Sequence, residues 1–218
     1  MASAAADTRA RRYDPAETRA RVLAAANMLF STKGFAGTGT ADIAREADVS
    51  EGSIFYHFGS KQNLLAQLGE RYGEAMIEAM QQGDKFEDLE PGILIPRIFE
   101  FCRATRLWEG ITGSPCDIGT PAVNKNPEAE PFYHAAKATT TAWINAQMVA
   151  GFARRGIAGV NIAIAASFTH HVVGDAIELI LTATSDEERA AIEAETVRYV
   201  RAACGYDACG YTGTSPDE

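Results

Sequence analysis

The 218-residue sequence has few cysteines, no paired metal-ligand spacing and no long apolar run. Cys102, Cys116, Cys204 and Cys209 lack the spacing of a zinc site, so we expect free thiols. A redox switch at the last two is the less favoured alternative, because no neighbouring residue in the sequence lowers a thiol pKa. No apolar run approaches the roughly 18 residues of a membrane span, and residues 1–13 lack the core of a signal peptide. We therefore expect a cytoplasmic protein without a metal or cofactor, and no contact with a membrane.

The chain also lacks an excess of positive charge, since 29 acidic residues outnumber 20 basic ones. The imbalance is uneven along the chain. Residues 1–61 contain eight basic and seven acidic residues, a balance of +1, whereas residues 62–218 contain 12 and 22, a balance of −10. The negative charge that repels a polyanion therefore lies outside residues 1–61. Within residues 1–61 the net charge is small, so attraction to phosphate must come from a few individually placed groups.

Strand patterns and internal repeats are missing too, and helical periodicity with caps predicts an all-α fold. Helices are expected from Pro15 to Gly34, from Ser60 to about Gln82, from Pro91, from between Pro127 and Pro131 to Arg155, from Asn161 to Thr184, and from Ser185 to Gly205. The helix after Ser60 has the predicted apolar stripe Leu64, Leu68, Tyr72, Ala75 and Ala79, and the last helix begins with a capping-box pattern. Residues 110–126 contain two prolines and three glycines and are expected to be irregular.

Residues 40–61 have the pattern of two short helices, a three-residue turn and the cap of a third helix. Thr40 is expected to cap the first short helix and Ser50 the second. Ile54 and Phe58 are four residues apart and should point inward, which leaves the other side chains of the second helix to its outer face. This pattern predicts a helix-turn-helix, which places the start of its second helix against DNA base edges.

Residues 15–65 resemble the DNA-binding domain of the TetR family of transcriptional regulators. The family string Val-Ser-x-Gly-x-(Leu/Ile)-(Tyr/Phe)-x-His-Phe-x-Ser-Lys is matched by Val49, Ser50, Gly52, Ile54, Phe55, His57, Phe58, Ser60 and Lys61. The resemblance implies an N-terminal three-helix DNA-binding domain followed by a C-terminal helical domain for ligand binding and dimerisation. The expected parts are an arm at 1–13, a DNA-binding domain at 14–61, an effector and dimerisation domain at 62–205, and a tail at 206–218.

The same resemblance assigns DNA contacts to this helix-turn-helix. Phosphate contacts are expected from Thr40, Tyr56, His57 and Lys61, and base contacts from Glu51, Gly52 and Ser53. Ser50, which caps the second helix, is included among the DNA-binding residues. Alternatively, Glu51 is only an acid that favours the positive start of its helix.

Five further residues leave the DNA assignment open. Phe55 keeps a ring for thymine methyl contact but lacks the hydroxyl of the tyrosine that is commonest in the family. Arg45 is either a phosphate contact or a solvated charge. Arg9, Arg11 and Arg12 precede the first helix as an arm for the minor groove or as a solvated segment, the latter being favoured.

The resemblance further implies a pocket for a small molecule between helices 91–109 and 131–155. The candidate wall residues are Phe99, Cys102, Trp108, Trp143, Gln147, Met148 and Phe152, although each taken alone is more often plain core. Because these residues are mainly apolar, the expected effector is apolar, aromatic or acyl in character and oriented by a group such as Gln147.

The helix 161–184 is apolar nearly all round, which predicts burial against a second subunit, with Val173 at the interface. In the family, the last two helices pair with their copies in a four-helix bundle, here 161–184 and 186–204. His171, Asp175 and Glu178 share one face and are interpreted as a His–carboxylate pair at this interface in preference to a metal site.

These patterns together predict a ligand-released repressor that binds a palindromic DNA operator as a homodimer. An activator, or an all-helical protein-interaction module without effector response, is the alternative. An enzyme is not expected, because the sequence has no spacing that supplies a nucleophile with its base or a catalytic metal.

Overall fold

The computed structural model of the chain describes residues 14–84, 90–105 and 127–206. Within those ranges all regular structure is helical, which confirms the predicted fold class. The expected arm, the irregular segment 110–126 and residues 207–218 of the expected tail lie outside the described residues.

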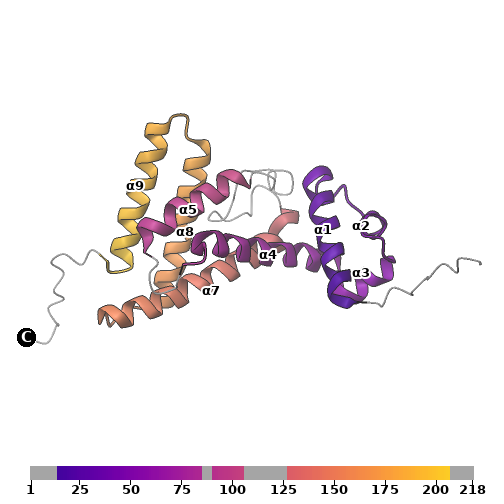
Figure 1. Cartoon of the computed structure of the whole chain (residues 1–218), viewed down its shortest axis with the longest axis horizontal. Helices are drawn as coiled ribbons and strands as arrows, with labels where there is room; N and C mark the ends of the chain where they lie inside the picture. The colour runs from indigo at the N-terminus through magenta and orange to yellow at the C-terminus, as the bar shows by residue number, and fades with distance from the viewer. Residues whose placement is uncertain (1–13, 85–89, 106–126, 207–218) are drawn as a thin grey trace, which may run out of the picture.

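Three helices gather at one end of an elongated molecule (Figure 1): α1 (Pro15–Lys33), α2 (Thr40–Glu46) and α3 (Glu51–Phe58). Asp14 caps α1, since its carboxylate accepts from the Ala16 N–H at 2.8 Å. Val22 and Phe30 of α1 are fully buried with Ile54 of α3 in one core. We call α1, α2 and α3 the three-helix unit.

Helix α4 (Lys61–Gln81) leaves this unit and runs beside α7 into the rest of the molecule (Figure 1). Ser60 caps it as predicted, accepting from the Asn63 N–H at 3.0 Å. Two glycines let α4 and α7 approach closely. A Cβ at Gly69 would clash with the Phe132 carbonyl oxygen of α7, and one at Gly73 would lie 2.9 Å from the Thr139 side chain of the same helix.

The predicted apolar stripe of α4 is partly wrong. Leu64, Leu68 and Tyr72 are buried as expected, but the stripe continues through Met76 and Met80 and leaves Ala75 exposed. The reason is that α4 packs against α5 as well as α7, so its buried face follows two partners.

Helix α5 (Pro91–Ala104) lies across the far end of α4. Arg97 of α5 donates to the carbonyl oxygens of Met80 and Gln81 at 2.9 and 3.1 Å and pairs with Asp84 at 2.6 Å. Arg97 thereby supplies hydrogen-bond donors to carbonyl groups at the end of α4 that have no partner within the helix. The short helix η4 (Pro127–Ala129) precedes α7 (Glu130–Arg155), which begins within the predicted interval.

Helices α8 (Ile162–Thr182) and α9 (Asp186–Ala203) complete the end of the molecule that is remote from the three-helix unit (Figure 1). Ser185 caps α9 as predicted, accepting from the Glu188 N–H at 3.1 Å. The predicted capping box differs in one detail: the Glu188 carboxylate accepts from the Thr184 N–H at 2.8 Å.

By length and composition α8 is apolar enough to cross a membrane, with a mean hydropathy of 1.2 over its most apolar window. The sequence prediction concerned uninterrupted apolar runs, and it is not contradicted, because His170, His171 and Asp175 interrupt this helix. In the structure 44% of that window is buried inside the protein, and a core helix of a soluble protein meets the same criterion.

Candidate nucleic-acid interface and effector cavity

The first helix of the predicted helix-turn-helix is present, but its cap differs from the prediction. Gly39 is the N-cap of α2, and Thr40 is already the first helical residue. The Asp42 carboxylate accepts from the Gly39 N–H at 3.4 Å. Hydrogen bonding from Arg45, followed by that of the Gly39 amide, lowers the pKa of Asp42 below its usual value.

Helix α3 presents its outer face as the sequence predicts. Ile54 and Phe58 are buried, and Ser50 caps the helix by accepting from the Ser53 N–H at 3.2 Å. Tyr56 is 80% exposed and Phe55 is 49% exposed. Glu51 and Gly52 are exposed at the start of the helix, and Ser53 and His57 are half-buried. The residues of α3 that are assigned to DNA are therefore at least partly accessible along its outer face.

Several of these residues already have partners within the protein. The Thr40 hydroxyl donates to the Glu51 carboxylate, which joins the starts of α2 and α3. The Arg45 guanidinium donates to the Asp42 carboxylate one helical turn away. A phosphate that takes the Thr40 hydroxyl or the Arg45 guanidinium must therefore compete with a carboxylate.

Lys61 has a second role besides the predicted phosphate contact. Its ammonium donates to the carbonyl oxygens of Phe35 and Thr38 at 2.9 and 3.0 Å, and it lies 4.0 Å from the centre of the Phe35 ring. An ammonium has three donors, and two of them hold the loop between α1 and α2. Lys61 thus fixes the start of α4 to this loop, and its phosphate contact stays a prediction.

Sequence reasoning missed Arg19. Its guanidinium donates to the His57 carbonyl oxygen at 2.8 Å and to the Gln67 side-chain oxygen at 2.5 Å, and lies 4.8 Å from the centre of the Phe58 ring. It therefore connects α1, the end of α3 and α4. No local pattern predicts this contact, because its partners lie 38 and 48 residues away in the sequence.

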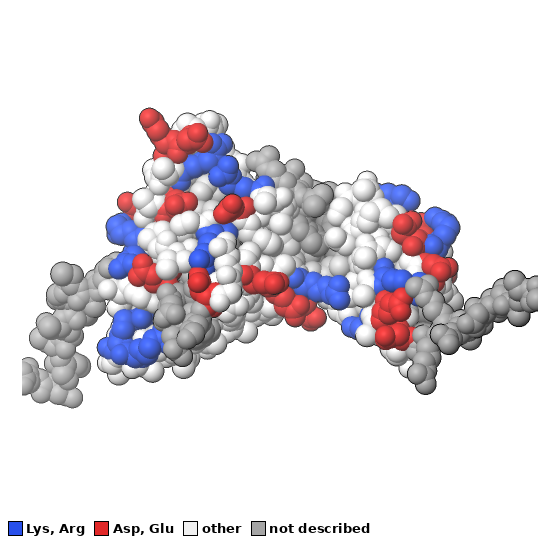
Figure 2. Space-filling model, viewed as in Figure 1, with Lys and Arg blue, Asp and Glu red and all other residues white. Residues whose placement is uncertain are grey.

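Charge on the three-helix unit is mixed. Figure 2 shows Lys and Arg side chains interspersed with Asp and Glu on this end of the molecule, without a continuous basic surface on the face in view. This agrees with the balance of +1 in residues 1–61, and the phosphate contacts of Tyr56 and His57 stay predictions.

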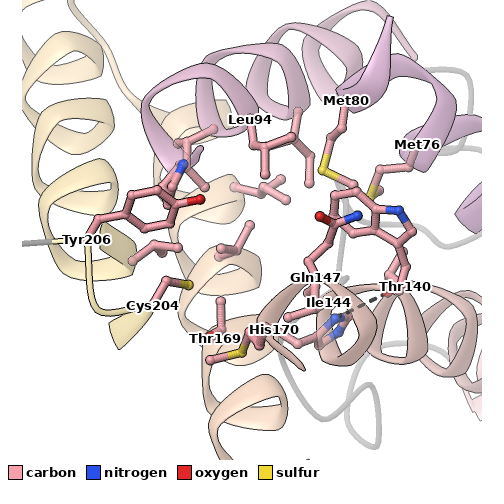
Figure 3. A pocket seen from close by; sticks show the side chains of 18 of the residues that line it. Met76, Met80, Leu94, Thr140, Ile144, Gln147, Thr169, His170, Cys204 and Tyr206 are labelled. Carbon is pink, nitrogen blue, oxygen red and sulfur yellow. Dashed lines mark hydrogen bonds between the residues drawn. The ribbon is translucent and has the colours of Figure 1, made fainter. Parts of the chain in front are cut away.

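A cavity of about 80 Å³ lies in the other part of the molecule, between α4, α5, α7, α8 and the end of α9. Figure 3 shows side chains from these elements converging on it. Three of the predicted wall residues, Trp143, Gln147 and Met148, line it, and their contact with a ligand stays a prediction. Met76 and Met80 of α4 also line it, although neither is among the predicted wall residues.

The remaining predicted wall residues do not line this cavity. Phe99, Cys102 and Phe152 are buried in packed clusters instead. On α5 the cavity is lined by Leu94, Ile95 and Ile98, which occupy the adjacent side of the helix. The predicted wall residue Trp108 lies outside the described residues.

The cavity has a few polar groups in an apolar wall. The Thr140 hydroxyl lies 3.2 Å from the buried His170 Nδ1. Cys204 also lines the cavity, and burial raises the pKa of its thiol to about 11, against an opposing effect of the nearby Arg155 charge. A thiol with a raised pKa is a poor nucleophile at neutral pH, so the structure does not favour the redox alternative for Cys204. Cys209 lies outside the described residues.

The structure gives His171 partners other than the predicted carboxylates. The ring of His171 lies 2.6 Å from the Ser167 carbonyl oxygen at Nδ1 and 3.1 Å from the Lys137 ammonium at Nε2. Since a carbonyl oxygen accepts only, Nδ1 carries the proton and Nε2 accepts from Lys137. Within the described ranges, no three His, Cys, Asp or Glu side chains gather as a metal site.

The outer face of α8 and α9 carries exposed apolar side chains: Ile164, Phe168, Leu179 and Tyr199. On α8, positions 164, 168 and 179 share one side, because 11 residues are close to three helical turns. Val173, which the sequence places at a subunit interface, is instead buried within the protomer and lines the cavity.

Comparison with known proteins gives a family match over the helix-turn-helix. Residues 22–68 match the model of "Bacterial regulatory proteins, tetR family". The "Probable HTH-type transcriptional regulator ArpR" of Pseudomonas putida is 35% identical over 75 residues. That match covers 34% of this chain and 36% of ArpR, so the chain aligns with about a third of this curated relative's length.

Solved structures resemble the whole described fold at low identity. RolR in complex with resorcinol has a TM-score of 0.56 at 18% identity, covering 89% of this chain and 95% of RolR. FadR from Bacillus subtilis in complex with stearoyl-CoA has a TM-score of 0.57 at 14% identity, covering 83% and 96%. At these identities the likeness concerns the fold alone.

Proposed function

Because the chain belongs to the TetR family of bacterial regulatory proteins and carries that family's DNA-binding helix-turn-helix, we propose that it is a cytoplasmic transcriptional repressor released from its operator by a small molecule. In this proposal residues 14–61 bind DNA, and residues 62–205 bind the effector and form a homodimer. The observation that carries the proposal is the exposed start of α3, held on a buried core through Ile54 and Phe58.

The proposed DNA contacts follow the chemistry of this surface. Tyr56 and His57 supply donors for phosphate, and Ser53 at the helix start supplies a group that can meet a base edge. The exposed ring of Phe55 suits a thymine methyl group. Glu51 is bonded to Thr40, which supports its alternative role of organising the two helix starts.

The exposed apolar face of α8 and α9 supports a homodimer. Phe168 is 65% exposed, and Ile164 and Leu179 lie on the same side of α8. Burial of such a face against its twofold copy removes apolar surface from water. A twofold dimer with α3 helices about 34–36 Å apart reads two half-sites one DNA turn apart, so the operator is expected to be palindromic.

The cavity is the proposed effector site. The ligands named for RolR and FadR, resorcinol and stearoyl-CoA, belong to those proteins, but they indicate that this fold accommodates chemically different molecules. In the present chain Met76 and Met80 belong to α4, which also carries Lys61. An effector that displaces these methionines therefore acts on the helix attached to the three-helix unit.

The test is selection of genomic DNA fragments by the purified full chain, followed by binding measurements over a range of salt concentrations. We expect the retained fragments to share a palindrome with half-sites one turn apart, and affinity to fall steeply with salt. Retained fragments without a common palindrome would contradict the proposal. For the effector site, Trp143→Ala should abolish release by an inducer while leaving operator affinity unchanged, with Trp143→Phe as the matched control.

A further inference from the structure

The charged groups near the cavity have one sign. Its wall contains Arg154 and Arg155 at one end and no Asp or Glu. Residues 62–218, to which the wall belongs, contain 22 acidic and 12 basic residues, so this absence runs against the composition of the surrounding protein. The raised pKa of Cys204 keeps its thiol neutral at pH 7, so that group adds no negative charge.

Arg155 differs from other arginines of the same part of the molecule. Arg97, Arg189, Arg198 and Arg201 each pair with a carboxylate at 2.6 to 2.8 Å. Arg155 forms no ion pair among the described residues. Its Nη2 donates to the Cys204 carbonyl oxygen at 2.6 Å, and its guanidinium lies 4.0 Å from the centre of the Tyr206 ring.

The Nε of Arg155 is buried and has no hydrogen-bond partner. A buried N–H without an acceptor is costly, and in native proteins such groups usually mark a function or an absent ligand. The fixed contacts to Cys204 and Tyr206 hold the guanidinium in place without neutralising it. A bound anion supplies both the missing acceptor and the missing charge.

The other side of the cavity also has donors without acceptors. Trp143 Nε1 and Gln147 Nε2 are buried and unpartnered in the same way. In Figure 3 the Gln147 side chain projects toward the cavity, with Tyr206 and Cys204 on the opposite side, Leu94 between the two sides and Met80 on the side of Gln147. The cavity therefore has an apolar middle, a cationic end and an amide end.

We propose that this cavity binds apolar carboxylic acids as their anions, with the carboxylate against Arg155 and the apolar body along Met76, Met80 and Ile144. This proposal rests on the proposed function, because it takes the cavity to be the effector site. An 80 Å³ cavity is smaller than the roughly 150 Å³ cavity that admits benzene. Even an acid with a single ring or a narrow chain therefore enters only when the flexible side chains of Met76 and Met80 move aside to enlarge the cavity.

The test measures direct binding to the full chain without DNA, by calorimetry. The probes are benzoate, 3-phenylpropanoate and octanoate, each compared with its own primary amide, which has almost the same shape but no charge. We expect at least one acid to bind about tenfold or more tightly than its amide, as a charge-assisted contact with a guanidinium implies. The proposal is overturned if no acid binds at millimolar concentration or if every acid binds no more tightly than its amide.

Variants locate the preference at Arg155. Arg155→Gln should reduce the acid-to-amide ratio to about one, Arg155→Lys should retain a preference for the acid, and Arg198→Gln on the surface of α9 should have no effect. An undiminished ratio in Arg155→Gln would also overturn the proposal. Because the wild-type ratio is measured first, a folding defect in one variant does not remove the test.

Operator release is measured separately with the same acids. An acid that binds through Arg155 without releasing DNA contradicts the effector function and leaves the carboxylate site intact. Release by a neutral molecule, with no acid preference, contradicts the carboxylate site and leaves the effector function intact.

Discussion

Replacing Lys61 by Met distinguishes the two roles of this residue. The change keeps an unbranched side chain of similar length and removes the ammonium. The Phe35 and Thr38 carbonyl oxygens lose their donor at 2.9 and 3.0 Å, although the Phe35 carbonyl still accepts from the Thr38 N–H at 3.3 Å.

The expected cost follows from these interactions. Hydrogen bonds to charged groups contribute about 1.5–3 kcal/mol each, and the cation–ring contact with Phe35 adds about 0.5–1 kcal/mol. Lys61 is half-buried, so water replaces part of both. We expect Lys61→Met to lower the free energy of unfolding by about 2–3 kcal/mol, which corresponds to roughly 4–12 °C in Tm for a chain of this length.

Urea denaturation and the salt dependence of operator binding together show whether Lys61 mainly fixes the loop or mainly binds phosphate. If Lys61 mainly fixes the loop, stability falls and the slope of log K against log salt changes little. If it mainly binds phosphate, stability is unchanged and the slope falls by about 0.9 for each phosphate that is no longer neutralised. The second result would refute the structural role. Tyr56→Phe is the control: its side chain is exposed, so operator affinity should weaken on all sequences without loss of stability.

Three other changes test the packing, the thiol and the proposed dimer. Gly69→Ala should destabilise the protein by about 1–3 kcal/mol in urea denaturation, because overpacking against the α7 backbone exceeds the helix-propensity gain of about 1 kcal/mol. The control Gly52→Ala should not destabilise the protein, because its Cβ would meet only the Ser50 hydroxyl at 3.8 Å. Equal stability of the two variants would contradict the packing argument. The folded-state pKa of Cys204 is raised from 9.0 to about 11, so its stabilising effect is present below pH 9 and is lost as the pH rises toward 11. Wild type should therefore lose up to about 2–3 kcal/mol more than Cys204→Ala over this range, and identical pH profiles would exclude the effect. Phe168→Glu should give a folded monomer in light scattering, because the side chain is exposed in the protomer; an unchanged dimer would remove it from the interface.

Helix starts were predictable from the sequence because the determining contacts are local. Asp14, Ser50, Ser60 and Ser185 each accept from an amide within three residues, as their sequence patterns indicate. Thr40 was misassigned because Gly39, which has no side-chain cap, can occupy the same position while Asp42 supplies the hydrogen bond. The outer face of α3 was predictable for the same local reason, since Ile54 and Phe58 determine its orientation.

The cavity wall was only partly predictable, because it depends on which helices meet. Periodicity indicates that Phe99 and Ile98 of α5 are both apolar and inward, but it does not say that Ile98 lines the cavity while Phe99 packs in the core. The contacts of Arg19 and Arg155 also join distant segments, 38 and 49 residues apart. Such contacts exist only after the helices have packed.

The close contact of Gly69 with the α7 backbone defines a point about which α4 can tilt. At 1.5 Å per residue, Met80 lies about 16 Å from Gly69 along the helix and Lys61 about 12 Å on the other side. If α4 tilts as a rigid lever about this point, a displacement of about 1 Å at Met80 moves Lys61 by about 0.7 Å in the opposite direction. Because Lys61 is tied to the Phe35 and Thr38 carbonyls, this reversed motion is passed to the loop before α2. In the proposed function, the ratio of the two arms would set how much of a movement in the cavity reaches the three-helix unit.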